Sequence, residues 1–474
     1  MSLGQISNRW VAFAILCVGA ILTVVDGAVV IVALPAMGSS LGTSQSSLVG
    51  VVNAYSVTSG GLLLCSGRLG DVFGYRRLFR VGICLFTLAS AGCAVSSSYT
   101  ELVVWRVVQG AAGSALIIST YSLAMILFPE LAPRARALSL LAFISSIGGV
   151  LGLFLGGTVT EILGWRWVFL INLPFGVLAY LLCLLVVEDV SEKPPSESID
   201  LSGALLITSA LVLAVFTIQG MDQESPVSAR TVISFVGIFL LLIAFLKSQV
   251  RSAVPLVPPD VLRAPNFAAC VVISVLSSIV GASSIFTSMY LQLALHYTPI
   301  QVALAFLPAS FVGALILLGL SARVVSRYGT KIPLIVGLAT ASLGLLLLAR
   351  SSISGVGYFG IVVGLVTVSV GVSIASTPNL VAAMSEVRKA ASGVATGVLA
   401  TATMVGSSIC LAALGAIFSA FRSQLLVAGA SGSSAADQAY WFVFLVSASL
   451  NALAIPFAFR IRAGGAVPVA SDCA

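Results

Sequence analysis

The sequence predicts an all-α integral membrane protein with fourteen transmembrane helices, arranged as two six-helix bundles with two extra central helices. Three observations carry this prediction: a composition suited to lipid, apolar runs that repeat along the chain, and an uneven distribution of basic residues. Of the 474 residues, 59% are hydrophobic and 8% are charged. Soluble domains carry about 25% charged residues, so most of this chain is expected to lie in a bilayer.

Apolar runs with the length of a membrane-crossing helix, about 20 residues, follow one another with short polar breaks. Misreading a pair of neighbouring runs would lower the count to twelve or thirteen. The expected spans are residues 10–33, 46–66, 79–97, 101–127, 136–160, 167–187, 200–219, 230–249, 267–292, 301–322, 332–350, 355–379, 393–419 and 440–460.

The distribution of Lys and Arg supports fourteen spans with both termini in the cytoplasm. In this topology eighteen of the 23 basic residues face the cytoplasm and four face the outside, while Arg106 lies within a span. Such an excess is the positive-inside pattern of membrane proteins. The net charge of +7 is therefore attributed to orientation in the membrane and not to nucleic-acid binding. We expect a multi-pass protein of the plasma (inner) membrane of a bacterium.

Two breaks divide the chain, an acidic, Pro-rich one at residues 188–200 and a second one at 251–263. A short internal repeat supports duplicated halves, because Arg68 and Gly74 recur 255 residues later as Arg323 and Gly329. Duplicated halves are a recurrent plan among transporters. The expected domains are an N-terminal bundle (1–190), a linker with two central helices (191–263), a C-terminal bundle (264–462) and a disordered tail (463–474).

Asp26 is the only acidic residue in the first apolar run. A carboxylate at the centre of a bilayer costs about 3 kcal/mol or more, so such groups usually serve an ion or substrate pathway. With a rise of ~1.5 Å per residue, Asp26 lies roughly 24 Å from the cytoplasmic start of its helix, and Arg106 about 8 Å below the outer surface. Since these two depths in the membrane agree, Arg106 is the expected ion-pair partner of Asp26. The alternatives are a static structural pair or an Arg106 side chain that reaches the interface.

Three polar residues within the spans, Asn53, Tyr55 and Gln109, are candidates to line a substrate cavity. Their other common role is hydrogen bonding between helices.

The segment between the second and third spans, residues 67–77 (GRLGDVFGYRR), combines glycines with charged residues. Glycine permits a tight turn and a close approach of helices, and Asp71 can cap a helix or pair with an arginine. We expect a cytoplasmic gating loop, with a charged loop that only fixes topology as the alternative. Its candidate residues are Gly67, Arg68, Gly70, Asp71, Gly74, Arg76 and Arg77.

This segment resembles the signature of the major facilitator superfamily between spans 2 and 3, with Tyr75 in the place of a basic residue. Residues 106–113 (RVVQGAAG) resemble the span-4 signature of that superfamily. Residues 24–35 (VVDGAVVIVALP) and 164–176 (GWRWVFLINLPFG) are similar to motifs of its fourteen-span drug:proton antiporters. The resemblance implies that the spans of Asp26 and Arg106 pack in one bundle.

Residues 148–157 (GGVLGLFLGG) resemble the span-5 antiporter motif of the same family. The motif's glycines are Gly148, Gly152, Gly156 and Gly157, and they form a face that can pack closely against another helix. Leu153 replaces the expected proline, so the proline kink is absent.

The resemblance implies a secondary active transporter that exports hydrophobic or cationic drugs by proton antiport with alternating access. An exporter or flippase of a lipid or other endogenous amphiphile is the alternative, and a non-transporting sensor is less expected. The sequence offers no soluble catalytic domain, so no enzymatic activity is expected, and no Gly-x-x-x-x-Gly-Lys motif, so ATP-driven transport is not expected. The expected partners are protons, a hydrophobic small molecule and membrane lipids, with a monomeric chain and no cofactor or metal.

Overall fold

The computed structural model is helical throughout the part of the chain that it describes, and it divides into two compact units. The first unit comprises residues 1–256 with 297–303, and the second comprises 257–296 with 304–474. The described residues are 3–43, 45–128, 130–186, 203, 205–210, 213, 217, 229–251, 264–354, 357–385, 387 and 392–461.

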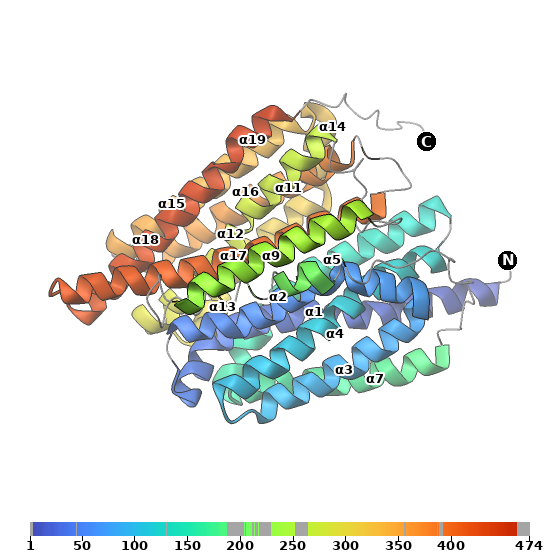
Figure 1. The fold of residues 1–474 in the computed structure, drawn as a ribbon, viewed down its shortest axis with the longest axis horizontal. Helices are drawn as coiled ribbons and strands as arrows, with labels where there is room; N and C mark the ends of the chain where they lie inside the picture. The colour runs from blue at the N-terminus through green and yellow to red at the C-terminus, as the bar shows by residue number, and fades with distance from the viewer. Residues whose placement is uncertain are drawn as a thin grey trace. The chain divides into compact units, whose positions relative to one another are not determined.

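In Figure 1 the helices from α1 to α7 run from blue to green, and those from α11 to α19 run from yellow-green to red. Those that begin in the first unit are α1 (Leu3–Leu41), α2 (Gln45–Phe73), α3 (Tyr75–Val95), α4 (Tyr99–Leu127), α5 (Leu131–Ile162), α6 (Arg166–Leu170), α7 (Asn172–Val186), α9 (Ala229–Arg251) and α13 (Pro299–Leu315). The second unit contains α11 (Pro265–Ser277), α12 (Ile279–Met289), η1 (Tyr290–Ala294), η2 (Ile316–Leu320), α14 (Ser321–Tyr328), α15 (Lys331–Ser354), α16 (Gly357–Met384), α17 (Ser392–Val427), α18 (Gly432–Ala452) and α19 (Ala454–Arg460).

The start of α4 shows how local sequence sets a helix boundary. The Ser98 hydroxyl accepts a hydrogen bond from the backbone N–H of Glu101 (3.3 Å), and the Glu101 carboxylate accepts one from the Ser97 N–H (2.8 Å). These contacts satisfy backbone donors that a helix start leaves without partners. The same α4 then continues through an apolar sequence to Leu127.

Helix pairing follows the same pattern in both units. In the first unit α1 packs against α5, and α3 packs against α4 and α7. In the second unit α11 packs against α17, and α15 packs against α16 and α18. The corresponding helices hold the same order along the chain, which agrees with the short sequence repeat around Arg68 and Arg323.

Within the described residues, ten helices are long and apolar enough to cross a membrane. Helix α2 is bent by 51° between Ser47–Leu63 and Cys65–Phe73. If these two parts are counted as one span, the number rises to eleven. Two shorter apolar helices lie at Val236–Gln249 and Pro299–Leu315. The chain is therefore a multi-pass membrane protein, and fourteen spans remain a prediction. Most of the expected span 200–219 and the tail from 463 lie outside the described residues, as do the break at 188–200 and, apart from Arg251, the break at 251–263.

The expectation of a loop over residues 67–77 was wrong. Helix α2 continues to Phe73 and α3 begins at Tyr75, so Gly74 alone joins them. Gly74 has a φ of 88°, a conformation that glycine adopts without the steric cost of a side chain. Gly67 and Gly70 are helical instead, because the helix continues past the apolar span.

Candidate functional site

The side chain of Asp26 is buried among the helices of the first unit, with 1% of its surface exposed. Its carboxylate accepts hydrogen bonds from three side chains. Arg106 Nη1 donates to Oδ2 at 2.5 Å, whereas Gln109 Nε2 and Asn172 Nδ2 donate to Oδ1 at 2.9 and 3.0 Å. Helices α1, α4 and α7 thus meet at one carboxylate. These hydrogen bonds stabilise a buried negative charge that would otherwise be very costly in free energy.

Arg106 has several partners besides Asp26. Its Nε donates to the backbone carbonyl of Val51 (3.2 Å), and its Nη1 also donates to Gln109 Oε1 (2.7 Å). The guanidinium carbon lies 4.4 Å from the ring centroid of Tyr55 and 5.9 Å from that of Phe169. Aromatic faces attract cations, by about 2 kcal/mol where both are shielded from water. The guanidinium therefore does not depend on Asp26 alone.

Ser90 on α3 completes the network. Its hydroxyl donates to the Phe86 carbonyl (2.8 Å). The same oxygen accepts from Gln109 Nε2 at 2.9 Å and from Asn172 Nδ2 at 3.4 Å. As a result, each of the three side chains that donate to Asp26 has a second acceptor already within hydrogen-bonding distance.

Glycines allow the helices to approach closely around this network. A side chain at Gly110, next to Gln109 on α4, would place its Cβ 2.5 Å from the carbonyl oxygen of Tyr55 on α2. Helix α5 contacts α1 on both sides of Asp26, since a Cβ at Gly152 would lie 3.0 Å from the Val25 carbonyl oxygen and 2.7 Å from Ala28 Cβ. One at Gly156 would lie 2.8 Å from Val29 Cα.

The other two predicted glycines of this face lie at its ends. A Cβ at Gly148 would lie 3.2 Å from Val24 Cγ1, which is again on α1. A Cβ at Gly157 would lie 2.6 Å from the carbonyl oxygen of Pro299 on α13. With Leu153 in place of proline, α5 is one continuous helix from Leu131 to Ile162.

The candidates on α2 have different surroundings. Tyr55 lies against Arg106, and its hydroxyl donates to the Thr23 carbonyl at 3.5 Å. Asn53 is fully buried, and neither its Nδ2 nor its Oδ1 has a hydrogen-bond partner in the structure. The network therefore includes Tyr55 through its ring and does not include Asn53.

The candidate gating residues lie away from this network, where α2 passes into α3. The hydroxyl of Tyr75 donates to Asp71 Oδ1 at 2.6 Å and to the Gly67 carbonyl at 3.2 Å. The Tyr75 ring lies so close to Gly70 that a Cβ there would overlap a ring carbon. Tyr75, which stands where the family has a basic residue, therefore anchors Asp71.

Three arginines flank this junction. Arg76 Nη2 donates to the Leu184 carbonyl of α7 at 3.4 Å, and Arg77 is exposed. The side chain of Arg68 lies outside the described part of the chain.

Asn172 and Ser90 are the members of the network that the sequence did not single out. Asn172 lies within residues 164–176, and an amide inside an apolar span was the available signal. No signal in the sequence pointed to Ser90, because serine is common in these helices. The number of residues between Ser90 and Asp26 does not show that the two lie close together.

The chain matches the model of the Major Facilitator Superfamily over residues 16–411. It belongs to that superfamily. It is 30% identical over 410 residues to "Multidrug resistance protein Stp" of Mycobacterium tuberculosis, covering 86% of this chain and 75% of the relative. It is 31% identical over 418 residues to "Cephamycin export protein CmcT" of Amycolatopsis lactamdurans, covering 86% and 85% of the two chains.

The fold is also that of solved transporter structures. A crystal structure of a mutant of the peptide transporter POT in complex with alafosfalin aligns with a TM-score of 0.68 at 16% identity, covering 95% of this chain and 94% of that chain. The protein is thus a membrane transporter and not an enzyme, related to drug-resistance efflux proteins of the Major Facilitator Superfamily.

Proposed function

We propose that this transporter exports drugs by proton antiport with alternating access, and that Asp26 is the group that binds the proton. The relatives support the substrate class, because one is named for multidrug resistance and another for the export of an antibiotic. The absence of a nucleotide-binding motif in the sequence leaves an ion gradient as the energy source.

One observation carries the choice of Asp26: every side chain that donates to it has a second acceptor. When Asp26 takes up a proton, Arg106 retains the Val51 carbonyl, Gln109 Oε1 and the Tyr55 ring. The amides of Gln109 and Asn172 retain the Ser90 hydroxyl. Loss of the charge on Asp26 therefore leaves each of these donors with a hydrogen-bond acceptor, and none of these buried N–H groups bears the cost of an unsatisfied donor, about 1–3 kcal/mol.

Protonation of Asp26 then changes how strongly α1 is bound to α4 and α7. In the ionised form the carboxylate binds α1 to α4 and α7 through three charge-assisted hydrogen bonds, which are stronger than neutral ones. Protonation removes the ion pair and turns one carboxylate oxygen into a donor. Helix α1 becomes less tightly bound to α4 and α7, and in our proposal this weakening allows the conformational change that releases substrate.

Everted membrane vesicles with an imposed proton gradient provide the test, with ethidium as the transported probe. In Asp26→Asn, we expect gradient-driven uptake to disappear while downhill ethidium exchange persists, because the helices still assemble. Asp26→Glu should retain part of the driven uptake. Glu161→Gln is the matched control and should leave it unchanged, since Glu161 accepts from the Ile300 N–H (3.1 Å) and lies outside the network.

Gradient-driven uptake by Asp26→Asn at the wild-type rate would exclude Asp26 as the proton site. A change in membrane lipid composition on expression, without movement of any drug, would instead favour export of a lipid.

A further inference from the structure

The second unit contains a cavity that the proton site does not explain. Its volume is about 350 Å³, and residues of α11, α15, α16, α17 and α18 line it. Drug-sized ligands occupy pockets of about 300–1,000 Å³. Among the residues that the structure describes, none that lines the cavity is charged. A charged ligand would therefore find no counter-ion among these residues.

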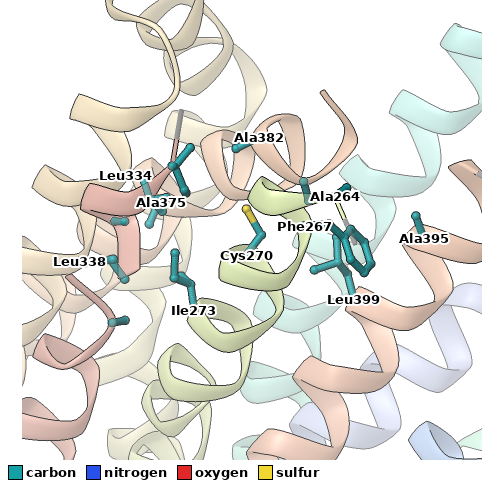
Figure 2. Close-up of a cluster of buried hydrophobic side chains, with 14 residues drawn as sticks. Ala264, Phe267, Cys270, Ile273, Leu334, Leu338, Ala375, Ala382, Ala395 and Leu399 are labelled. Carbon is teal, nitrogen blue, oxygen red and sulfur yellow. The ribbon is translucent and has the colours of Figure 1, made fainter. Parts of the chain in front are cut away.

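One side of the cavity is apolar. Figure 2 shows the cluster of buried side chains that forms this side, and Ile273, Leu334, Leu338, Ala375 and Leu399 belong both to the cluster and to the cavity wall. A ligand seated here would bury apolar surface, which contributes about 25 cal/mol per Å².

Two side-chain amides also line the cavity, and backbone carbonyls fix their orientation. Asn451 Nδ2 donates to the Leu338 carbonyl (3.0 Å), and Asn379 Nδ2 donates to the Cys270 carbonyl (3.5 Å). A carbonyl oxygen only accepts hydrogen bonds, so each amide must turn its nitrogen toward that carbonyl. The Oδ1 atoms of both amides then have no hydrogen-bond partner, although Asn451 is fully buried.

The cavity is accessible along one face of α16. Val372 and Leu380 line it and are 40% and 46% exposed. They lie eight residues apart, and therefore on the same side of the helix as Ser376 between them. On α17 the lining residue Ala400 is exposed as well. A ligand can therefore enter the cavity from this side without unfolding of the unit.

We propose that this cavity is a binding site for an uncharged, largely apolar molecule that carries O–H or N–H donors. The unpartnered Oδ1 atoms of Asn379 and Asn451 accept those donors, and the apolar wall holds the rest of the molecule. An anion would face two acceptors, and a cation without donors would satisfy neither of them while losing its hydration. This assignment rests on the proposed export function and adds to it a binding site for uncharged substrates.

Equilibrium binding to the purified full-length chain in lipid nanodiscs tests the assignment without a proton gradient. Chloramphenicol is the probe, because it is uncharged at neutral pH and carries two hydroxyls and an amide N–H. We expect Asn379→Leu to weaken binding about five- to tenfold, the net value of one hydrogen bond. Ala400→Phe, which narrows the exposed side, should weaken it further. Asn266→Leu is the matched control, a buried α11 asparagine outside the cavity wall, and it should bind as wild type.

Two further ligands distinguish the contribution of hydrogen-bond donors to binding from the effect of ligand charge. Chloramphenicol diacetate lacks both hydroxyl donors and should bind more weakly, with little response to Asn379→Leu. Tetraphenylphosphonium, a permanent cation without donors, should not displace chloramphenicol. The proposal is overturned if wild-type protein does not bind chloramphenicol, if neither cavity variant changes its affinity, or if tetraphenylphosphonium displaces it. Asp26→Asn should bind chloramphenicol normally, so failure of the proton assignment would leave this result intact.

Discussion

Asn172 donates its side-chain amide to Oδ1 of Asp26 over 3.0 Å, although 146 residues separate the two in the sequence. The contact brings α7 to the same carboxylate that α4 reaches through Arg106 and Gln109. Asn172 is itself 1% exposed, so no water competes for its amide at the surface. It is a positioning residue for Asp26.

Replacing Asn172 with leucine should therefore lower stability. A hydrogen bond to a charged group contributes about 1.5–3 kcal/mol, and thermal unfolding in detergent should show the loss as a lower melting temperature. Asn53→Leu is the matched control, because neither amide atom of this buried asparagine has a partner. It should be neutral or stabilising, and equal losses in the two variants would contradict the role of Asn172.

Gly152→Ala tests the contact between α5 and α1. The added Cβ would lie 2.7 Å from Ala28 Cβ and 3.0 Å from the Val25 carbonyl oxygen, so α1 must shift near Asp26. Overpacking of this kind costs about 1–3 kcal/mol, and ethidium transport in vesicles should fall. At Gly149 a Cβ meets nothing within 4 Å, so Gly149→Ala should transport normally. Similar rates for both variants would show that this contact does not matter for transport.

Tyr75→Phe tests whether the bond to Asp71 controls transport. The variant keeps the ring against Gly70 but removes the donor to Asp71 and Gly67. We expect a changed rate of ethidium transport, with protein levels in the membrane near normal. Tyr328, which precedes Gly329 in the repeated segment, is 54% exposed, and Tyr328→Phe should leave transport unchanged. If Tyr75→Phe also transports at the wild-type rate, the contact has only a local structural role.

The sequence predicted the helical membrane fold and the superfamily because apolar runs and short motifs are local properties. The pairing of Asp26 with Arg106 could be predicted from their similar depths in the membrane. Each residue of a helix adds the same rise, so the sequence position gives the depth. The same argument could not find Asn172, because depth does not tell which face of a helix a side chain occupies or which helix lies beside it. The packing of α1, α4 and α7 supplies both.

The glycines between α2 and α3 were expected to permit a tight turn and a close helix approach. Of Gly67, Gly70 and Gly74, only Gly74 has a positive φ. At Gly70 the missing side chain makes room for the Tyr75 ring instead. A glycine in a sequence can mean a turn or a close contact, and the sequence spacing does not distinguish the two.

The carboxylate network lies wholly within the first unit, since Asp26, Ser90, Arg106, Gln109 and Asn172 all belong to residues 1–256. A rotation of that unit as a solid block would leave every distance in the network unchanged. In the proposed mechanism, the free energy of proton uptake drives such a rotation through deformation inside the unit, such as sliding or turning of α1 against α4 and α7. An internal crosslink between α1 and α4 would consequently arrest coupled transport even though both halves stayed free to turn.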